Sequence, residues 1–255
     1  MTARRDPSSS RRPERPRRES GAATLIHGRN PVREALRGPR TVHRVWATEP
    51  AAREPWLKNV RVERASAAEI EQRAGTDAHQ GLCAEVSPYR YAEAGELLAR
   101  PEPLIVALDE VTDPQNLGAI ARSAECAGAT GLVLPERRSA EINATVCKAS
   151  AGAVEHLPVA QVRNLADFLG EAKAAGCWCY GASADARAAY TDPDFTGGVV
   201  LVLGAEGKGL RPRVAASCDA LLSIPLRGRV ESLNVSATAA VLLYAILQKR
   251  LDKGA

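Results

Sequence analysis

The sequence lacks any apolar run close to the ~20 residues that a membrane-spanning helix needs, although 45% of its 255 residues are hydrophobic. Its N-terminus lacks the apolar core of a secretory signal, and no two of its six cysteines form a CxxC pair. Scattered cysteines are typical of buried, reduced thiols in a cytosolic protein. We therefore expect a cytoplasmic protein with no membrane segment and no metal centre.

The body of the chain also lacks an excess of either charge. The formal net charge is +4, from 34 basic and 30 acidic residues. Residues 1–20 hold seven arginines and three acidic residues, which leaves 27 residues of each sign in the rest of the chain. Contacts of the body with a nucleic acid must therefore depend on local patches rather than on overall charge.

The excess positive charge lies in an N-terminal tail, residues 1–22, which is rich in arginine, proline and serine. Such a segment buries too little apolar surface to offset its ordering entropy, so we predict that it is disordered. Two roles stay open for it: loose, salt-sensitive attraction to phosphates, which deleting residues 1–22 should weaken mainly at low salt, or simple solubilisation.

After the tail, predicted strands and helices alternate, which favours an α/β fold with a mostly parallel sheet. Residues 23–90 read as a small α/β unit, in which Ser66 and Glu69 have the spacing of a helix capping box. A linker follows at 91–103, and residues 104–255 form a larger α/β unit. Within it we expect helices over 139–153 and over the apolar C-terminal segment, whose wide apolar face suits burial on two sides.

Polar residues gather where three predicted strands end. Leu104 to Leu108 lead into Asp109, with Asn116 and Arg122 on the helix that follows. Val199 to Leu203 lead into the turn GAEGKG, which contains Glu206, and Ala220 to Ile224 lead into PLRGRVESLN, which contains Ser232 and Asn234. Glycine-bearing loops at the carboxyl edge of a parallel sheet are typical of a ligand site.

Each of these features also has a plain structural explanation. GAEGKG matches neither the dinucleotide fingerprint GxGxxG nor a phosphate-binding P-loop, and a glycine-rich turn is often only a connection. Asn116 and Asn234 each stand where a helix is expected to begin, so helix capping accounts for them without chemistry. No structural role is evident for Glu206 or Ser232.

Three segments, taken together and in order, resemble motifs 1, 2 and 3 of the SpoU (TrmH) family of SPOUT RNA methyltransferases. They read LDEVTDPQNLGAIARSAECAGATGLVLP, LVLGAEGKGL and IPLRGRVESLNVSATAAVLL. IHGRNPVREAL and AHQGLCAEV resemble the small substrate-binding domain of the family. Within the family, the resemblance is greatest to enzymes that methylate a guanosine 2'-hydroxyl in 23S rRNA.

The resemblance implies an α/β fold tied into a deep trefoil knot, with an N-terminal RNA-binding domain and a homodimeric assembly. True knots are very rare, so periodicity alone favours an unknotted sheet. The implied reaction moves a methyl group from S-adenosylmethionine to a ribose 2'-hydroxyl of RNA, without a metal. Alignment of the reacting atoms and help in removing the hydroxyl proton are the main tasks of such a protein.

The resemblance assigns roles to nine residues. The adenosine and methionine parts of the cofactor would be held by Gly204, Ile224, Leu226 and Leu233, although core packing also accounts for the three apolar ones. The catalytic side would be lined by Asn116, Arg122, Glu206, Ser232 and Asn234. An arginine is a poor base because its pKa is above ~12, so orientation and charge stabilisation are the roles favoured for Arg122. Glu206 would fix Asn116 or the arginine.

One departure from the family pattern is the charge of the third motif, which carries Arg227, Arg229 and Glu231. The arginines are candidates for phosphate contacts. Three functions remain open: methylation of 23S rRNA, the same reaction on tRNA, and a non-catalytic RNA-binding or ribosome-assembly factor. The last predicts loss of the polar motif residues, yet all five are present.

Overall fold

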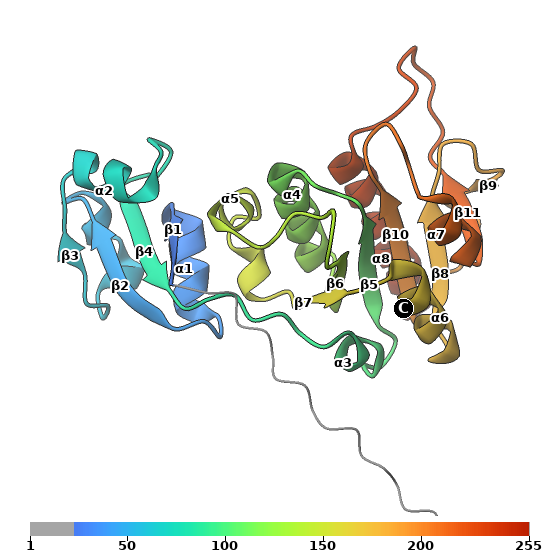
Figure 1. Ribbon diagram of the computed structural model, residues 1–255, viewed down its shortest axis with the longest axis horizontal. Helices are drawn as coiled ribbons and strands as arrows, with labels where there is room; N and C mark the ends of the chain where they lie inside the picture. Colours follow the sequence, from blue (N-terminus) through green and yellow to red (C-terminus); the bar gives the residue numbers. More distant parts are fainter. Residues whose placement is uncertain (1–22, 255) are drawn as a thin grey trace, which may run out of the picture.

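A computed structural model describes residues 23–254 of the chain. The tail that we predict to be disordered, residues 1–22, lies outside the described residues. The described part forms two lobes, each built on its own β-sheet, with the short helix α3 (Ala94–Leu98) on the connection between them (Figure 1). Among residues 23–254, no helix has both the length and the hydropathy needed to cross a bilayer.

The N-terminal lobe is a four-stranded sheet in the order β1-β4-β2-β3. Strand β4 is antiparallel to both of its neighbours, and β3 is parallel to β2. The predicted capping box is confirmed, because the Ser66 hydroxyl accepts from the Glu69 amide and the Glu69 carboxylate accepts from the Ser66 amide. The elements are β1 (Thr24–His27), α1 (Arg29–Arg37), β2 (Val42–Ala47), the 3-10 helices η1 (Ala51–Arg53) and η2 (Pro55–Leu57), β3 (Glu63–Arg64), α2 (Ala67–Ala74) and β4 (Leu82–Val86).

The C-terminal lobe is a seven-stranded, entirely parallel sheet in the order β7-β6-β5-β10-β8-β11-β9. Strand β5 begins at Leu104, after α3 and the residues that follow it. The elements are β5 (Leu104–Asp109), α4 (Pro114–Cys126), β6 (Gly131–Pro135), α5 (Ala144–Ala149), η3 (Ala153–Glu155), β7 (Val159–Val162), α6 (Leu165–Ala174), β8 (Trp178–Ala182), β9 (Ala188–Ala189), β10 (Val199–Gly204), α7 (Pro212–Ser217), β11 (Ala220–Ser223) and α8 (Val235–Gly254). The predicted fold class, a mostly parallel α/β sheet with a small N-terminal α/β domain, is therefore confirmed.

Helices cover both faces of this sheet because successive strand residues point to opposite faces. In β10, Val199, Leu201 and Leu203 pack into the core that contains α4 and α8. The residues between them, Val200 and Val202, pack into a second core with α6 and α7. The central strands are apolar on both sides, which explains why their sequences read as continuous apolar runs.

The helix expected over 139–153 is shorter than the sequence indicates. Helix α5 spans only Ala144–Ala149 and starts at Asn143, whose side chain accepts from the Val146 amide. After Ser150 the backbone enters the left-handed region at Ala151 and Gly152, and the chain continues as η3. An uninterrupted helix is therefore impossible there, and the break turns the chain toward the N-terminal lobe.

Helix α8 returns to the face of the sheet that α4 covers, and the two helices pack against each other. The chain between β11 and α8 therefore passes over the carboxyl edge of the sheet, where the glycine turn after β10 also lies. Figure 1 shows this loop standing above the edge. The trefoil knot implied by the resemblance would be closed at this crossing.

The two lobes share a packed junction. The Arg40 guanidinium lies 2.9 Å from Glu155 of the C-terminal lobe, and both side chains are at least 94% buried. Arg40 also donates to the Ser87 carbonyl, and the Tyr89 hydroxyl donates to the Val154 carbonyl at 3.2 Å. The buried pair and these hydrogen bonds join the two lobes at this junction.

Candidate active site

Three of the predicted site residues meet at the carboxyl edge of the large sheet. The Asn234 side-chain amide donates to the Asn116 side-chain oxygen at 2.9 Å and to a carboxylate oxygen of Glu206. Asn116 lies on α4, Glu206 in the turn after β10, and Asn234 at the start of α8. One residue from each of the three motifs therefore enters a single hydrogen-bonded cluster.

The capping explanation holds for Asn234 and is wrong for Asn116. The Asn234 side-chain oxygen accepts from the Ser236 amide at 2.8 Å, which caps α8. Helix α4 is capped instead by Asp113, which accepts from the Gln115 amide, and Pro114 takes its first position. Asn116 thus lies inside the helix, buried, with its side-chain oxygen bonded to Asn234. Capping does not account for it.

Glu206 is exposed, and among residues 23–254 it accepts hydrogen bonds only from the start of α8. Besides the bond from Asn234, it accepts a long one, 3.5 Å, from the Val235 amide. We expected Glu206 to fix Asn116 or the arginine. In the structure Glu206 accepts a hydrogen bond from Asn234 instead, and Asn234 in turn donates to Asn116.

The glycine turn is anchored by an ion pair that sequence reasoning missed. Asp109, at the end of β5, is 1% exposed and accepts from the Arg211 backbone amide and Nε, each at 2.8 Å. The hydrogen bond to Asp109 raises the pKa of Arg211. Because Arg211 follows the turn that carries Glu206, this pair fixes the turn to the neighbouring strand. An acidic residue directly after a buried strand was the available signal.

Gly204 has no room for a side chain. A Cβ built there would overlap the backbone of Gly209, where the turn folds back with a 2.9 Å hydrogen bond from the Gly209 amide to the Ala205 carbonyl. Glycine is therefore required for the shape of the turn itself.

The loop between β11 and α8 has the composition of a ligand-binding surface. Leu226 and Leu233 are 38% and 42% exposed, Val230 is 75% exposed, and Ile224 is half-buried at the loop's start. Within the described part of the chain, the main-chain groups of 225–233 make no hydrogen bond. Exposed apolar side chains beside free main-chain donors and acceptors suit a flat, polar-edged ring.

Two predicted catalytic residues stand apart from the cluster. Arg122 is exposed, six residues after Asn116, which places it about 9 Å further along α4 and about 120° around it. Ser232 is exposed in the loop before α8. Neither makes a side-chain hydrogen bond or ion pair with any residue in 23–254.

A cleft of about 360 Å³ opens beside the cluster. Asn116 and Glu206 line it together with Asp113 and two cations, Arg138 and Lys208. Arg138 is paired with Glu110 at 3.3 Å, whereas Lys208 has no side-chain partner among the described residues. Glu110 lines the cleft as well, so three carboxylates, one amide and two cations face it. Such a lining suits a polar ligand with hydroxyl groups and separate charged groups.

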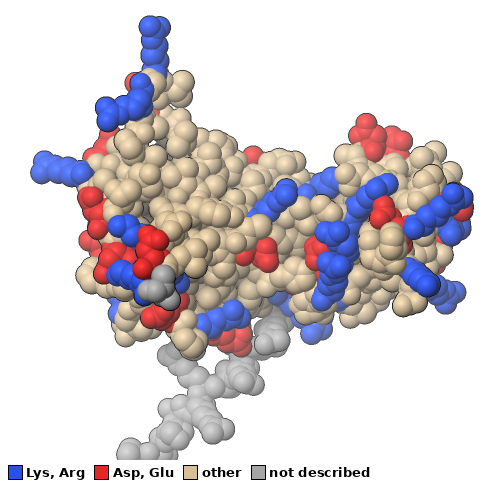
Figure 2. All heavy atoms as spheres, turned by 180° about the vertical axis from the view of Figure 1, so that it is seen from behind, with Lys and Arg blue, Asp and Glu red and all other residues tan. Residues whose placement is uncertain are grey.

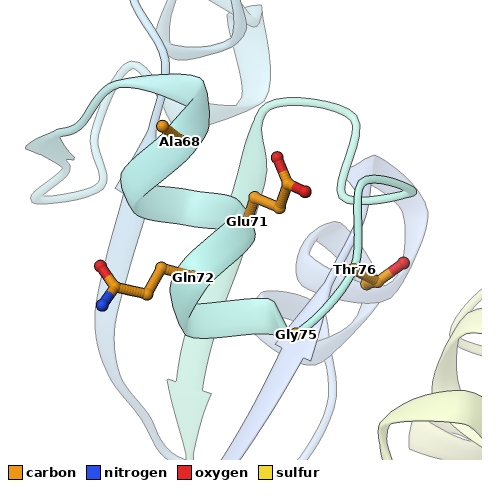
Figure 3. A pocket seen from close by; sticks show the side chains of 5 residues that line it. All are labelled: Ala68, Glu71, Gln72, Gly75 and Thr76. Carbon is orange, nitrogen blue, oxygen red and sulfur yellow. The ribbon is translucent and has the colours of Figure 1, made fainter.

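A second hollow, of about 430 Å³, lies on the N-terminal lobe between α2 and the turn after it. Figure 3 shows its lining, Ala68, Glu71, Gln72, Gly75 and Thr76, with no basic or aromatic side chain. It therefore offers no positive charge to a phosphate and no aromatic ring to stack on a base. The residues described also contain no group of three His, Cys, Asp or Glu side chains suited to hold a metal ion.

Two family models match the chain. The one described as the SpoU rRNA Methylase family matches residues 103–244, and the one described as RNA 2'-O ribose methyltransferase substrate binding matches residues 25–92. A putative TrmH family tRNA/rRNA methyltransferase of Bacillus subtilis is 38% identical, over 90% of this chain and 97% of that protein. An uncharacterized tRNA/rRNA methyltransferase of Synechocystis is 39% identical, and the chain spans 63% of its length.

Solved structures are similar over both lobes or over part of the chain. A SpoU methyltransferase of Streptomyces viridochromogenes in complex with AdoMet (S-adenosylmethionine) has a TM-score of 0.76 and 27% identity, over 90% of this chain and 91% of that one. An AdoMet-bound rRNA methyltransferase of Sinorhizobium meliloti has a TM-score of 0.75 and 26% identity, over 89% and 87%. A TrmH/SpoU tRNA modifying enzyme of A. aeolicus has a TM-score of 0.54 and 30% identity, over 63% and 82%.

Proposed function

The chain belongs to the SpoU family of RNA methyltransferases, and from this premise we propose that it methylates a ribose 2'-hydroxyl of RNA with S-adenosylmethionine as the methyl donor. The observation that carries the proposal is the cluster of Asn116, Glu206 and Asn234, which joins the three motifs at the carboxyl edge of the sheet. This edge is the usual place of a ligand site in a parallel α/β sheet.

S-adenosylmethionine fits the residues present, and it supplies an activated methyl group on a sulfonium. Gly204, Ile224, Leu226 and Leu233 would hold it, with main-chain groups of 225–233 meeting its polar edges. The exposed fractions of Leu226 and Leu233 support this assignment over core packing, because buried core residues would be shielded from solvent.

The cluster would orient the RNA ribose. Asn116 and Asn234 bond to each other and Glu206 bonds to Asn234, so the side chains hold one geometry before RNA arrives. A preorganised site of this kind lowers the barrier by keeping the hydroxyl in line with the methyl group. Ser232 stands in the loop that would close over the cofactor, near enough in sequence to Asn234 to reach the same ribose.

We propose a guanosine in 23S rRNA as the substrate, and the comparisons support the rRNA part of this proposal. The Sinorhizobium rRNA methyltransferase resembles this chain over both lobes, whereas the A. aeolicus tRNA modifying enzyme resembles it over 63% of its length. The N-terminal lobe, matched by the substrate-binding model, would contact the RNA around the target.

Choosing between rRNA and tRNA requires both RNAs from cells that lack this protein. We expect labelled methyl transfer to large-subunit rRNA and none to tRNA. Label confined to tRNA would support the same reaction with tRNA, rather than rRNA, as the substrate. Absence of label in naked RNA and in ribosomal precursors would favour a non-catalytic binding factor.

The protein would act as a homodimer formed through α8. This helix carries a stripe of exposed apolar side chains, Val241, Tyr244 and Leu251, on its outer face, which is typical of a protein interface. Helix α4 packs beside α8, so a second copy on this stripe would lie close to Arg122. Arg122 has no hydrogen-bond or ion-pair partner within its own described chain. In the dimer it would complete the active site of the second copy.

Replacing Tyr244 by glutamate should dissociate the dimer, because a charge would be buried without a partner. Light scattering should show the molar mass of the variant falling to that of one chain. The matched control is Trp178→Glu, which changes another exposed aromatic side chain outside the stripe. A monomeric wild-type protein, or a dimeric Tyr244→Glu variant, would contradict the assignment of α8.

A further inference from the structure

One positive charge at the junction of the lobes has no counter-ion among residues 23–254. Lys148 lies on α5, which contacts α4 of its own lobe and both α1 and β1 of the N-terminal lobe. Its side chain is partly buried, and among residues 23–254 it forms no ion pair or hydrogen bond. Two carboxylates of the N-terminal lobe are paired with arginines of α1 instead: Glu54 with Arg29 at 2.8 Å, and Glu34 with Arg33 at 2.8 Å.

The junction is shaped to admit this amine. A Cβ built at Gly28 would lie only 2.6 Å from the Lys148 Nζ and 3.2 Å from the Gln80 side-chain oxygen. Gly28 has a φ of +99°, a conformation that favours glycine. The amine therefore rests against a bare stretch of backbone between β1 and α1, in the space that a side chain would otherwise fill.

An unpaired ammonium in this position is costly to the free protein. Burial lowers the pKa of Lys148, and burial, Lys148 and His79, in that order, lower the pKa of His27. Taking a charge out of water without a partner destabilises the folded state, and an apolar side chain would avoid the cost. A bound anion would remove that penalty, since it would restore a counter-charge to the ammonium.

The position also suits the substrate of the proposed reaction. Gly118, two residues after Asn116, packs so tightly on α5 that a Cβ there would lie 2.9 Å from the Ser150 amide. The segment that joins the two sites along the chain contains Arg138, which lines the cleft. The junction is also held rigid by Arg40 and Glu155, so its distance from the cluster is fixed.

We propose that Lys148, held between the lobes against Gly28, binds a backbone phosphate of the RNA next to the nucleotide that enters the cleft. The inference rests on the proposed function for its ligand. It makes the junction of the lobes, rather than the N-terminal lobe alone, part of the RNA-binding surface.

The test is the salt dependence of RNA binding by the full chain, with a short RNA hairpin and a tRNA transcript as probes. Lys148→Met removes the charge and keeps the length of the side chain, and Lys148→Arg keeps the charge. Each lost phosphate contact lowers the slope of log K against log salt by about 0.7–0.9, which corresponds to about fivefold weaker binding at 0.15 M salt. We expect this change for Lys148→Met and not for Lys148→Arg.

The matched control is Lys173→Met, since Lys173 lies at the end of α6 beside Asp219, away from the cleft. Thermal unfolding adds a second readout: removing an uncompensated charge should leave the midpoint of Lys148→Met equal to or above that of the wild type. If the slope of log K against log salt is the same for Lys148→Met and the wild type, the proposal is overturned. If, in addition, the thermal midpoint of Lys148→Met is lower, Lys148 has a structural role instead.

Methyl transfer by the unsubstituted protein is measured in parallel and separates the two claims. If the wild type transfers methyl groups but Lys148→Met leaves the salt slope unchanged, only the phosphate contact is overturned. A reduced slope for Lys148→Met, without methyl transfer by the wild type to any RNA, overturns the proposed function alone. A wild-type protein that binds no RNA overturns both.

Discussion

Replacing Glu206 by alanine is expected to lower kcat for RNA methylation by about a hundredfold, the usual cost of misplacing a reacting group by about 1 Å. Glu206 is the exposed anchor that accepts from Asn234, which in turn donates to Asn116. Without the carboxylate, the amide of Asn234 loses one of its two acceptors and the start of α8 loses a contact. The measurement is steady-state methyl transfer under saturating cofactor.

Glu206→Gln separates position from charge. Glutamine keeps an oxygen that accepts from Asn234, so we expect this variant to stay within about tenfold of the wild type. Glu171→Ala, which removes an exposed glutamate on α6, serves as the control for a lost surface charge. Wild-type turnover by a folded Glu206→Ala variant would remove Glu206 from the site, and equal losses in both variants would show that the charge itself is required.

The second large effect is expected for Arg122→Ala, which should reduce methyl transfer by about a thousandfold or more while the fold stays intact. Arg122 is exposed and makes no hydrogen bond or ion pair with a described residue, so its removal costs little stability. Arg213→Ala, an exposed arginine on α7, is the control. Normal turnover by Arg122→Ala would exclude this residue from the reaction.

A mixing experiment tests whether Arg122 serves the second copy. In a dimer of one Arg122→Ala chain and one Glu206→Ala chain, a site built across the subunits would be intact once and doubly defective once. Re-associated mixtures of the two variants should then recover about a quarter of wild-type activity, since about half of the dimers are mixed and half of their sites are intact. Absence of recovery would mean that Arg122 serves its own chain.

Much of the fold follows from local patterns in the sequence. The apolar β-branched runs of β5 and β10 predicted strands buried on both faces, and the spacing of Ser66 and Glu69 predicted the cap of α2. The ends of α5 were beyond this reasoning. They depend on the left-handed turn at Ala151 and Gly152 and on packing against the N-terminal lobe. Neither feature produces a hydrophobic periodicity that the sequence would reveal.

The site was predictable to the extent that it lies in short motifs. Asn116, Glu206 and Asn234 stand at strand ends or helix starts, where parallel sheets hold ligands. Their mutual contacts, and the pairing of Asp109 with Arg211 across more than a hundred residues of sequence, arise only from tertiary packing. For the same reason, only the fold shows that Lys148 lies between the two lobes and has no ion-pair partner among residues 23–254.

The measurement that tests the central claim most directly is the chemical position of the methyl group. RNA is incubated with the protein and S-adenosylmethionine carrying an isotopic methyl group, and then digested to nucleosides. We predict a 2'-O-methylated nucleoside, guanosine in large-subunit rRNA, and a strong reduction with Glu206→Ala. A label on a base, or label at the ribose that Glu206→Ala and Arg122→Ala leave unchanged, would contradict the account.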